Sequence, residues 1–419
     1  MKQFTVAILG CGARGAETYG RLMYGAKDKY KIVSLCDFSE KTLEKYGEIF
    51  DVPSQNRFSS EEEFFQEKRA ELLVIGTQDA DHVRHCVAAL EVGYDVLLEK
   101  PLTAKREECE TLLAAQKKYG GKVLVCHVLR YAPAFMKVKE LLDQGSIGRL
   151  VAMQAIEQVG YWHYSHSYVR GNWRRSEDTS PMILAKCCHD LDLLQWYAGS
   201  KCKSVSSIGD LTFFKEENAP EGAAKRCGEC KLEEECPFSA KNVYIKCWNA
   251  SGCPENLWPY NVVTPVLPIT EQALVKALEE GPYGRCVFAC DNDVVDHQLT
   301  NMTFENGVKA TLTMTAFTWG GGRIMKFFGT AGELVLDESL DTIEFKPYGK
   351  GKETISLAKL SEGGYGHGGG DWGLVCKLYE VLCGKIAPET SLDASVESHL
   401  IGIAAEESRR KGGELISLR

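Results

Sequence analysis

The sequence lacks three features that would assign the protein to particular classes. No stretch approaches the roughly 18 consecutive apolar residues that a membrane-spanning helix needs, so no membrane partner is expected. No cluster of lysine and arginine offsets the formal net charge of −9, which argues against a nucleic-acid partner. A secretory signal is not recognisable either, because the apolar segment before Cys11 is too short for one and fits a strand better.

Cysteine, by contrast, is abundant, with 17 residues in a chain of 419. Disulfide frameworks are typical of small secreted chains, and an odd number leaves at least one thiol unpaired. We therefore expect reduced cysteines and a cytoplasmic location. A chain of this length exceeds the usual size of one domain, so two domains with separate cores are expected.

The most informative stretch is the glycine-rich segment at 10–15, GCGARG. It follows an apolar run at 5–9 and precedes a helix-like segment, and a second apolar run at 30–36 ends in Asp37. A GxGxxG pattern alone is weak evidence. With a strand before it, a helix after it and an acidic residue about 20 positions later, it has the layout of a dinucleotide-binding βαβ unit. The alternative is an ordinary strand, turn and helix with a surface aspartate.

Each glycine of this segment has a steric role in such a unit. Gly10 permits the tight turn, Gly12 allows the backbone to approach a pyrophosphate, and Gly15 allows the helix to pack close to the strand. The start of the helix offers free N–H groups to the phosphates, so two further residues are expected at the cofactor, Ala13 and Arg14.

Asp37 predicts which dinucleotide binds. Its carboxylate can accept hydrogen bonds from a ribose diol and would repel a 2′-phosphate. The next residues, Phe38 and Ser39, supply no cation to counter that repulsion. NAD is therefore the expected cofactor, in preference to NADP.

Strands alternate with helices over the first 127 residues. Apolar runs at 72–76, 94–98 and 122–126 are separated by helical segments at 79–92 and 104–119. This order predicts an α/β fold with a doubly wound parallel sheet, a Rossmann domain, in which ligands bind beyond the carboxyl ends of the strands. The residues expected near the cofactor at those ends are Thr77, Gln78, His82, Glu99, Lys100 and His127.

Glu99, Lys100 and Pro101 directly follow one of these strands. Lys100 is expected to point the opposite way from Glu99, and Pro101 to end the hydrogen-bonded ladder. A lysine at the mouth of a nucleotide cleft can lie over the reacting hydroxyl, where partial burial lowers its pKa toward working pH. We interpret Lys100 as catalytic; the alternative is a solvated lysine at a strand end.

The order of these motifs resembles that of the Gfo/Idh/MocA oxidoreductases, a family named for glucose-fructose oxidoreductase and inositol dehydrogenase. The matching segments are the glycine-rich turn, Asp37, Thr77 with His82, and 99–101, followed by 130–133, 145–148, 189–192 and 329–333. The resemblance implies an NAD-binding Rossmann domain at 1–127. It also implies a substrate-binding α/β domain at 128–419, with a large, mostly antiparallel sheet, and a homo-oligomer. One departure is that the family's usual Thr-Pro pair is Thr77-Gln78 here.

The resemblance also implies that His189 corresponds to the family's catalytic histidine. In the family this histidine acts as acid or base near the sugar hydroxyl, with an aspartate four residues before it. That position is Ala185 here, so the usual Asp–His pairing is absent, and Lys186 is the charged residue that could substitute. The alternative for a single helical histidine is a structural role.

Aromatic and basic residues are concentrated at 161–175. Such a loop suits a sugar, whose C–H face stacks on rings while its hydroxyls take charged hydrogen bonds. The alternative is a loop for domain packing or oligomer contacts. A glycine-rich segment at 363–371 is expected to be a mobile part of the active site. The predicted substrate contacts are Arg130, Tyr168, Arg170, Trp173 and His367.

A cysteine-rich insert is expected at about 215–260. A CxxC pair with further cysteines has the spacing of a structural zinc site, although the second half lacks a matching CxxC. The candidate ligands are Cys227, Cys230, Cys236 and Cys247. Free thiols in a surface lobe are favoured over a metal site, and an iron–sulfur cluster is less favoured still.

These observations predict an NAD-dependent oxidoreductase that oxidises a hydroxyl of a sugar, polyol or glycoside, with a small carbohydrate as its partner. Lys100, helped by His189, would take the hydroxyl proton as hydride moves to the nicotinamide. A second interpretation is a redox-neutral glycosidase or lyase, in which a transient ketone allows elimination and Lys186 supplies extra acid or base. A third is an NAD-binding regulator without activity.

Overall fold

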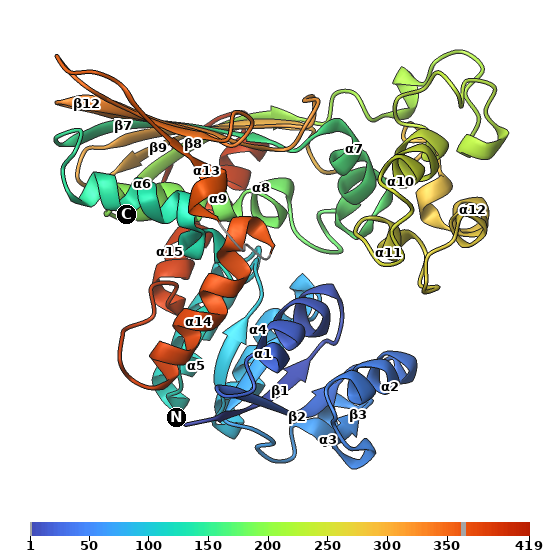
Figure 1. Ribbon diagram of the computed structural model, residues 1–419. Coiled ribbons are helices and arrows are strands. Elements are labelled where there is room, and N and C mark those ends of the chain that lie inside the picture. Colours follow the sequence, from blue (N-terminus) through green and yellow to red (C-terminus); the bar gives the residue numbers. More distant parts are fainter. Residues whose placement is uncertain (1, 362–365) are drawn as a thin grey trace.

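Two sheets organise the chain, one with six strands and one with nine (Figure 1). The computed structural model describes residues 2–361 and 366–419. In Figure 1 the six-stranded sheet and its helices form the lower part, and the nine-stranded sheet lies at the top with helices beneath it. Helices of the second half of the chain therefore lie between the two sheets.

The first sheet is parallel throughout, in the order β3-β2-β1-β4-β5-β6. Its strands are β1 Phe4–Leu9, β2 Tyr30–Cys36, β3 Arg57–Phe58, β4 Leu72–Ile75, β5 Asp95–Leu98 and β6 Val123–Val125. Every residue of β4 is buried, as expected for a strand covered by helices on both faces. The strand order reverses between β1 and β4, which is where such sheets bind ligands. The predicted doubly wound parallel sheet is confirmed.

Helices connect the strands of this domain. They are η1 Ala13–Gly20, α1 Arg21–Gly25, α2 Glu40–Ile49, η2 Ser54–Asn56, α3 Glu61–Phe64, η3 Asp79–Asp81, α4 His82–Val92 and α5 Arg106–Tyr119. The Ser39 hydroxyl accepts a hydrogen bond from the Thr42 N–H, and Ser60 caps α3 in the same way. The first helix starts at Ala13, directly after Gly12.

The second sheet is mostly antiparallel, in the order β14-β13-β12-β11-β7-β10-β9-β8-β15, and only β7 and β10 run parallel. Its strands are β7 Leu150–Gln158, β8 Cys202–Asp210, β9 His297–Phe304, β10 Lys309–Thr315, β11 Gly322–Gly329, β12 Gly332–Asp337, β13 Thr342–Pro347, β14 Glu353–Ser356 and β15 Ile416–Ser417. Side chains alternate between buried and more exposed along β9 to β11, as expected when helices cover one face. The predicted antiparallel platform is therefore confirmed.

Helices cover the lower face of this sheet in Figure 1 and connect it to the first domain. They are η4 Val128–Tyr131, α6 Pro133–Asp143, α7 Tyr161–Tyr164, η5 Ser165–Arg170, η6 Asn172–Arg174, α8 Met182–Ala185, α9 Cys188–Ala198, α13 Leu357–Leu360, η11 His367–Gly369, α14 Gly370–Leu382 and α15 Leu392–Arg410. Among the described helices, none combines the length and apolar character needed to cross a bilayer.

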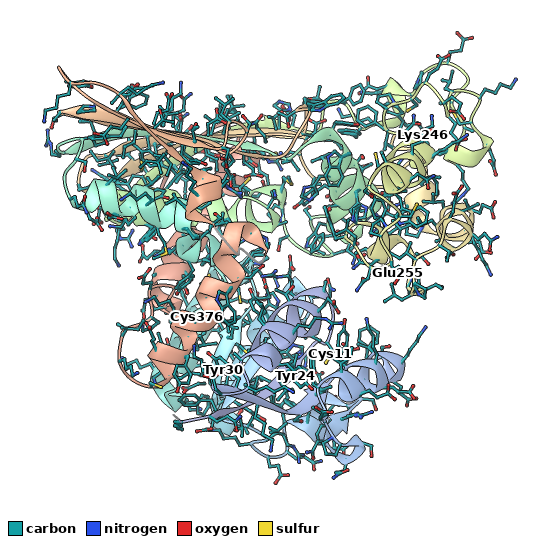
Figure 2. The ribbon with its side chains drawn as sticks, viewed as in Figure 1. Cys11, Tyr24, Tyr30, Lys246, Glu255 and Cys376 are labelled. Atoms are coloured by element: carbon teal, nitrogen blue, oxygen red, sulfur yellow. The ribbon has the colours of Figure 1, made fainter. Side chains whose placement is uncertain are left out.

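Helix α14 packs into the core of the first domain although it comes late in the chain. Leu374, Leu378 and Leu382 belong to the same buried cluster as residues of β1 and β2. The Tyr30 hydroxyl donates a hydrogen bond to the Val375 carbonyl at 2.8 Å, and Figure 2 shows Tyr30 below Cys376 of α14. The C-terminal part of the chain thus helps to complete the nucleotide-binding fold.

The insert fills the connection between β8 and β9, residues 211–296, and is longer than the predicted 215–260. Its helices are η7 Glu216–Asn218, η8 Cys227–Glu229, η9 Lys241–Lys246, α10 Cys247–Ala250, α11 Tyr260–Val263, α12 Glu271–Glu280 and η10 Pro282–Gly284. It has its own apolar cluster, which includes Tyr244 and Trp248. Glu255 marks the part of the insert nearest the first domain (Figure 2), and the neighbouring Asn256 amide donates to the Glu17 carboxylate at 3.5 Å.

Candidate active site

The glycine-rich turn has the geometry of a dinucleotide cradle. Gly10 has a φ of +83°, and a Cβ there would lie 2.7 Å from the Gly76 carbonyl carbon. A Cβ on Gly15 would overlap the Gly10 carbonyl oxygen, so the helix and the turn approach more closely than any side chain allows. Gly12 is different, because a Cβ there would meet no atom within 4 Å. Its missing side chain leaves open space at the start of the helix, which fits a bound pyrophosphate.

Asp37 lies beside this turn at the end of β2. One carboxylate oxygen accepts a hydrogen bond from the Cys11 N–H at 2.8 Å, and the other accepts from the Ser39 N–H at 2.9 Å. Each oxygen keeps a lone pair for a further donor, such as a ribose hydroxyl. The adjacent Phe38 side chain is 93% exposed. The residues present therefore fit the ribose end of a dinucleotide.

Arg14 and Glu99, both predicted at the cofactor, pair with each other beneath the turn. The Arg14 guanidinium contacts the Glu99 carboxylate at 2.7 Å and the Asp371 carboxylate at 2.8 Å. Burial alone would raise the pKa of Glu99, but Arg14 outweighs burial and lowers it. Asp371 begins α14, so this network ties the glycine-rich turn to β5 and to the C-terminal part of the chain.

The loop after β4 is held by histidines. The two ring nitrogens of His82 lie 2.7 Å from the Pro101 carbonyl oxygen and 3.2 Å from the Thr77 carbonyl oxygen. The Thr77 hydroxyl lies 3.0 Å from Nδ1 of His85. Because His82 is buried and both of its nitrogens face backbone carbonyls, it shapes the loop, whereas Gln78 on the same loop is exposed.

Lys100 projects from the end of β5 toward the second domain. Its ammonium donates a hydrogen bond to the Ala185 carbonyl at 3.4 Å, at the end of α8. The positive charge of Lys100 also affects two imidazoles. Burial lowers the pKa of His189 most, Lys100 is the second cause, and Lys100 also contributes to the lowered pKa of His163. The Lys100 ammonium thus lies at the end of α8, shortly before the helix α9 that contains His189.

His189 is held as a neutral imidazole. It is 7% exposed, and its Nδ1 has no hydrogen-bond partner among the described residues. Burial and then Lys100 hold its pKa well below 6.5. It is also in the first turn of α9, where the helix dipole disfavours a cation. A neutral ring with a free nitrogen can accept a proton.

Lys186 belongs to a buried charge cluster. Its ammonium lies 3.2 Å from the Glu157 carboxylate, which also pairs with Arg323 at 2.9 Å. Arg323 in turn pairs with Asp190 at 2.8 Å. Burial raises the pKa of Asp190 to about 7, although Arg323 opposes that shift. Neither Glu157 nor Arg323 was recognisable from the sequence as part of this site, since each is one polar residue in a strand.

Two family models match the chain. The model of the oxidoreductase family with an NAD-binding Rossmann fold, Gfo/Idh/MocA, matches residues 4–127, and a C-terminal domain of the same family matches residues 135–231. Together they cover more than half of the sequence. The chain belongs to the Gfo/Idh/MocA oxidoreductase family. The predicted family and its NAD-binding domain are confirmed.

Curated relatives are also oxidoreductases. Putative oxidoreductase YteT of Bacillus subtilis is 25% identical over 372 residues, covering 84% of this chain and 82% of its own. The scyllo-inositol 2-dehydrogenase (NADP(+)) IolW of the same organism is 30% identical over 175 residues, covering 42% of this chain and 46% of its own.

Solved structures share the fold over the whole chain. Levoglucosan dehydrogenase in complex with NADH and levoglucosan has a TM-score of 0.72 at 16% identity, and both chains are fully covered. The WlbA dehydrogenase of Bordetella pertussis, in complex with NADH and UDP-GlcNAcA, has a TM-score of 0.67 at 16% identity, with 100% of this chain and 99% of that chain covered. At this level of identity the likeness concerns the fold alone.

Two arginines predicted as substrate contacts have other partners in this Gfo/Idh/MocA protein. Arg130 is buried and bidentate to Asp192, with both N–O distances at 2.7 Å. Arg170 is 1% exposed and donates to the Arg285 and Phe238 carbonyls at 2.8 and 2.7 Å. These donors are used inside the protein, which differs from the expectation that the two arginines face a substrate.

Of the remaining predicted substrate residues, His367 lies near His189. His367 is hydrogen-bonded to Asp371 at 2.9 Å, and its ring centre lies 6.2 Å from that of His189. Tyr168 is buried, with the half-buried Trp173 ring 6.4 Å away. The glycine-rich segment predicted at 363–371 is described only from Gly366, because residues 362–365 lie outside the described part of the chain.

His163 is a site residue that the sequence did not single out. Its ring lies 6.1 Å from Tyr168 and 5.0 Å from Trp258 of the insert. Burial lowers its pKa well below 6.5, and the nearby charges of Lys186 and Lys100 add to the effect. Its only sequence signal is membership of the aromatic segment 161–175.

His127 lies behind His189, further inside the protein. Its ring centre is 6.0 Å from that of His189 and 5.5 Å from that of His399. Burial lowers its pKa to about 4, and neither ring nitrogen has a hydrogen-bond partner among the described residues. It supports the catalytic region from below, deeper than the cofactor contact that the sequence predicted.

A cavity of ≈ 590 Å³ lies beside this site. Its lining includes Asp79, Thr103 and Ser180 but neither Lys100 nor His189. It is therefore not the place where those two side chains would meet a substrate.

Proposed function

We propose that the protein oxidises a hydroxyl of a sugar, polyol or glycoside with NAD as the cofactor, and that Lys100 and His189 handle the proton. The observation that carries this proposal is a contact between the two domains: the Lys100 ammonium donates a hydrogen bond to the Ala185 carbonyl at 3.4 Å, shortly before the helix that contains His189, and the same charge contributes to the lowered pKa of His189. The family supports oxidoreductase chemistry at this place.

The cofactor supplies the hydride acceptor when bound. Gly12 and the N–H groups that start η1 would hold its pyrophosphate, and Asp37 its ribose hydroxyls. The Lys100 ammonium can donate a hydrogen bond to the substrate hydroxyl and stabilise the negative charge that develops on its oxygen. His189, neutral and with Nδ1 free, is the group that can accept the proton.

A carbohydrate substrate is supported by the wall of the site. Trp162, His163 and Trp258 lie within 6 Å of one another, ring centre to ring centre, and Tyr168 is adjacent. Aromatic faces of this kind stack on the C–H face of a sugar ring. Relatives named as inositol 2-dehydrogenases, and the levoglucosan dehydrogenase fold, point to the same class of substrate.

The test is turnover of a carbohydrate panel that includes inositols, levoglucosan, nucleotide sugars and nitrophenyl glycosides. NADH formation supports the dehydrogenase, whereas release of nitrophenol without net NADH supports the redox-neutral glycosidase. NAD binding with no turnover of any kind contradicts both.

Lys100→Met tests the residue assignment. It should reduce kcat by about 10²- to 10⁴-fold, the usual contribution of a proton-handling group, while NADH binding measured by fluorescence persists. Lys105→Met is the matched control, since Lys105 is exposed and pairs only with Glu108. Unchanged turnover in Lys100→Met would remove the central residue from the mechanism.

A homo-oligomer in a reducing compartment is part of the same proposal. Ile208, Leu299 and Phe328 are exposed on strands whose neighbouring residues are buried against helices, so they lie on the uncovered face of the nine-stranded sheet. A second copy packed there would bury them. All 17 cysteines are free thiols, which supports a reducing location such as the cytoplasm.

A further inference from the structure

Four cysteines of the insert line one small cavity. Cys227, Cys230 and Cys236 come from its first part, and Cys286 comes from the segment just before β9. Backbone pairing joins these two segments: Arg226 bridges to Arg285, and the Cys286 N–H donates to the Lys225 carbonyl at 2.9 Å. Thiols distant in sequence are thus fixed side by side.

This set differs from the one that the sequence predicted. Cys247, the expected fourth ligand, is exposed at the start of α10 and does not line the cavity. Cys286 replaces it. Cys290 also stays outside, with its Sγ donating to the Cys286 carbonyl at 3.2 Å.

The cavity also contains a buried cation. Arg170 is 1% exposed and lines the cavity together with Glu233, its Nη1 has no hydrogen-bond partner among the described residues, and no ion pair joins it to a carboxylate in that part of the chain. Nη2 lies 3.6 Å from the Cys227 sulfur. A buried charge without a partner is unfavourable.

We propose that Cys227, Cys230, Cys236 and Cys286 bind one structural zinc ion. A CxxC pair and two further thiolates complete a tetrahedral Cys₄ site, and four thiolates around one divalent ion carry a net negative charge. Arg170 would neutralise that charge and donate a hydrogen bond to the Cys227 sulfur, as residues around metal ligands commonly do.

The size of the cavity favours one ion over a cluster. Its volume is ≈ 20 Å³, which is room for one water molecule or one ion. An iron–sulfur cluster with its sulfides needs several times that space. Within residues 2–361 and 366–419 no group of three or more His, Cys, Asp or Glu side chains is placed to hold a metal ion, so zinc binding would require the thiols to rotate about their Cα–Cβ bonds.

The ion would connect the insert to the wall of the active site. Arg170 ends η5, the segment that also contains Tyr168 and follows His163. A zinc site at Arg170 therefore fixes the insert against the segment proposed to stack on the substrate. The site itself is independent of the proposed function, since its ligands touch neither Lys100 nor His189.

The experiment is metal analysis of the full-length protein, purified under reducing conditions from cells supplied with zinc. We expect about one zinc ion per chain by plasma mass spectrometry, retained in Cys247→Ser and Cys290→Ser and lost in Cys286→Ser. Should Cys286→Ser fail to fold, the wild type still decides. After zinc removal, added Co²⁺ must give the charge-transfer absorption of thiolate-bound cobalt.

Four outcomes overturn the proposal. Wild type without zinc and without the cobalt–thiolate absorption shows that no metal site exists. Equal loss of zinc in Cys247→Ser and Cys286→Ser shows that the ligand set is wrong. Iron with visible absorption identifies an iron–sulfur cluster in place of zinc. A disulfide among these four cysteines in the reduced preparation excludes any metal bound by all four.

Discussion

Replacing Arg130 by methionine separates a structural role from a substrate contact. Arg130 donates to both oxygens of Asp192 at 2.7 Å and to the Glu389 carbonyl at 3.0 Å, and Asp192 is 1% exposed. Burial alone would raise the pKa of Asp192, but Arg130 and then His127 lower it. With methionine at position 130, the Asp192 carboxylate stays buried but loses its guanidinium partner. Nε2 of His127 lies 3.8 Å from this carboxylate. Removing one partner of such a pair costs about 3–5 kcal/mol of unfolding free energy.

The assay is urea unfolding followed by tryptophan fluorescence. The double variant Arg130→Met with Asp192→Leu should be more stable than Arg130→Met alone, by about 1–3 kcal/mol, because it removes the unpaired charge. Arg84→Met is the control, since it breaks an exposed pair with Glu61 that is worth about 1 kcal/mol or less. The loss should also shrink as the pH falls, because Asp192 without Arg130 is a buried carboxylate whose pKa is raised and which takes up a proton. Wild-type stability in Arg130→Met, combined with weakened substrate binding, would refute this reasoning and restore Arg130 as a substrate contact.

Two further predictions concern the cofactor and the response to acid. Asp37→Ala should weaken NADH binding by about tenfold or more, because it removes a hydrogen bond to a charged group. In fluorescence titrations it should also reduce the preference for NADH over NADPH. An unchanged preference would contradict the role of Asp37. His127 has a folded pKa of about 4, below its unfolded value of about 6.5, so the unfolded state binds the extra proton between these values and stability falls as pH drops through this window. His127 alone should account for about 3 kcal/mol of the unfolding free energy lost on acidification. In urea unfolding at a series of pH values, His127→Gln should lack this part of the pH dependence. Identical pH slopes in the variant and the wild type would show that His127 is not responsible.

The first domain was predictable because its signals are local. Gly10, Gly12 and Gly15 are spaced by the steric demands of one turn, and Asp37 follows one apolar strand, so a short window of sequence contains the whole motif. The structure places these four residues side by side, as expected. Lys100 was identified for the same reason, since it directly follows a strand whose end lies at the nucleotide site.

Residues whose partners are distant in the sequence could not be assigned. Arg130 finds Asp192 only after α9 packs against the loop that follows β6, and nothing in the sequence around Arg130 distinguishes a buried ion pair from a substrate contact. The same holds for Cys286, which joins the cysteines of the CxxC segment only through the pairing of Arg226 with Arg285. Helix α14 is a third case, because its apolar face completes a core that begins at β1.

The absence of an aspartate at Ala185 explains how charge is arranged at this site. A carboxylate next to His189 would favour the imidazolium, since an opposite charge raises the pKa of a histidine. In this protein the Lys100 ammonium donates a hydrogen bond to the backbone carbonyl of Ala185. The neighbouring Lys186 is paired with Glu157. Burial and then the Lys100 charge therefore hold the pKa of His189 well below 6.5, with no carboxylate at position 185 to oppose them.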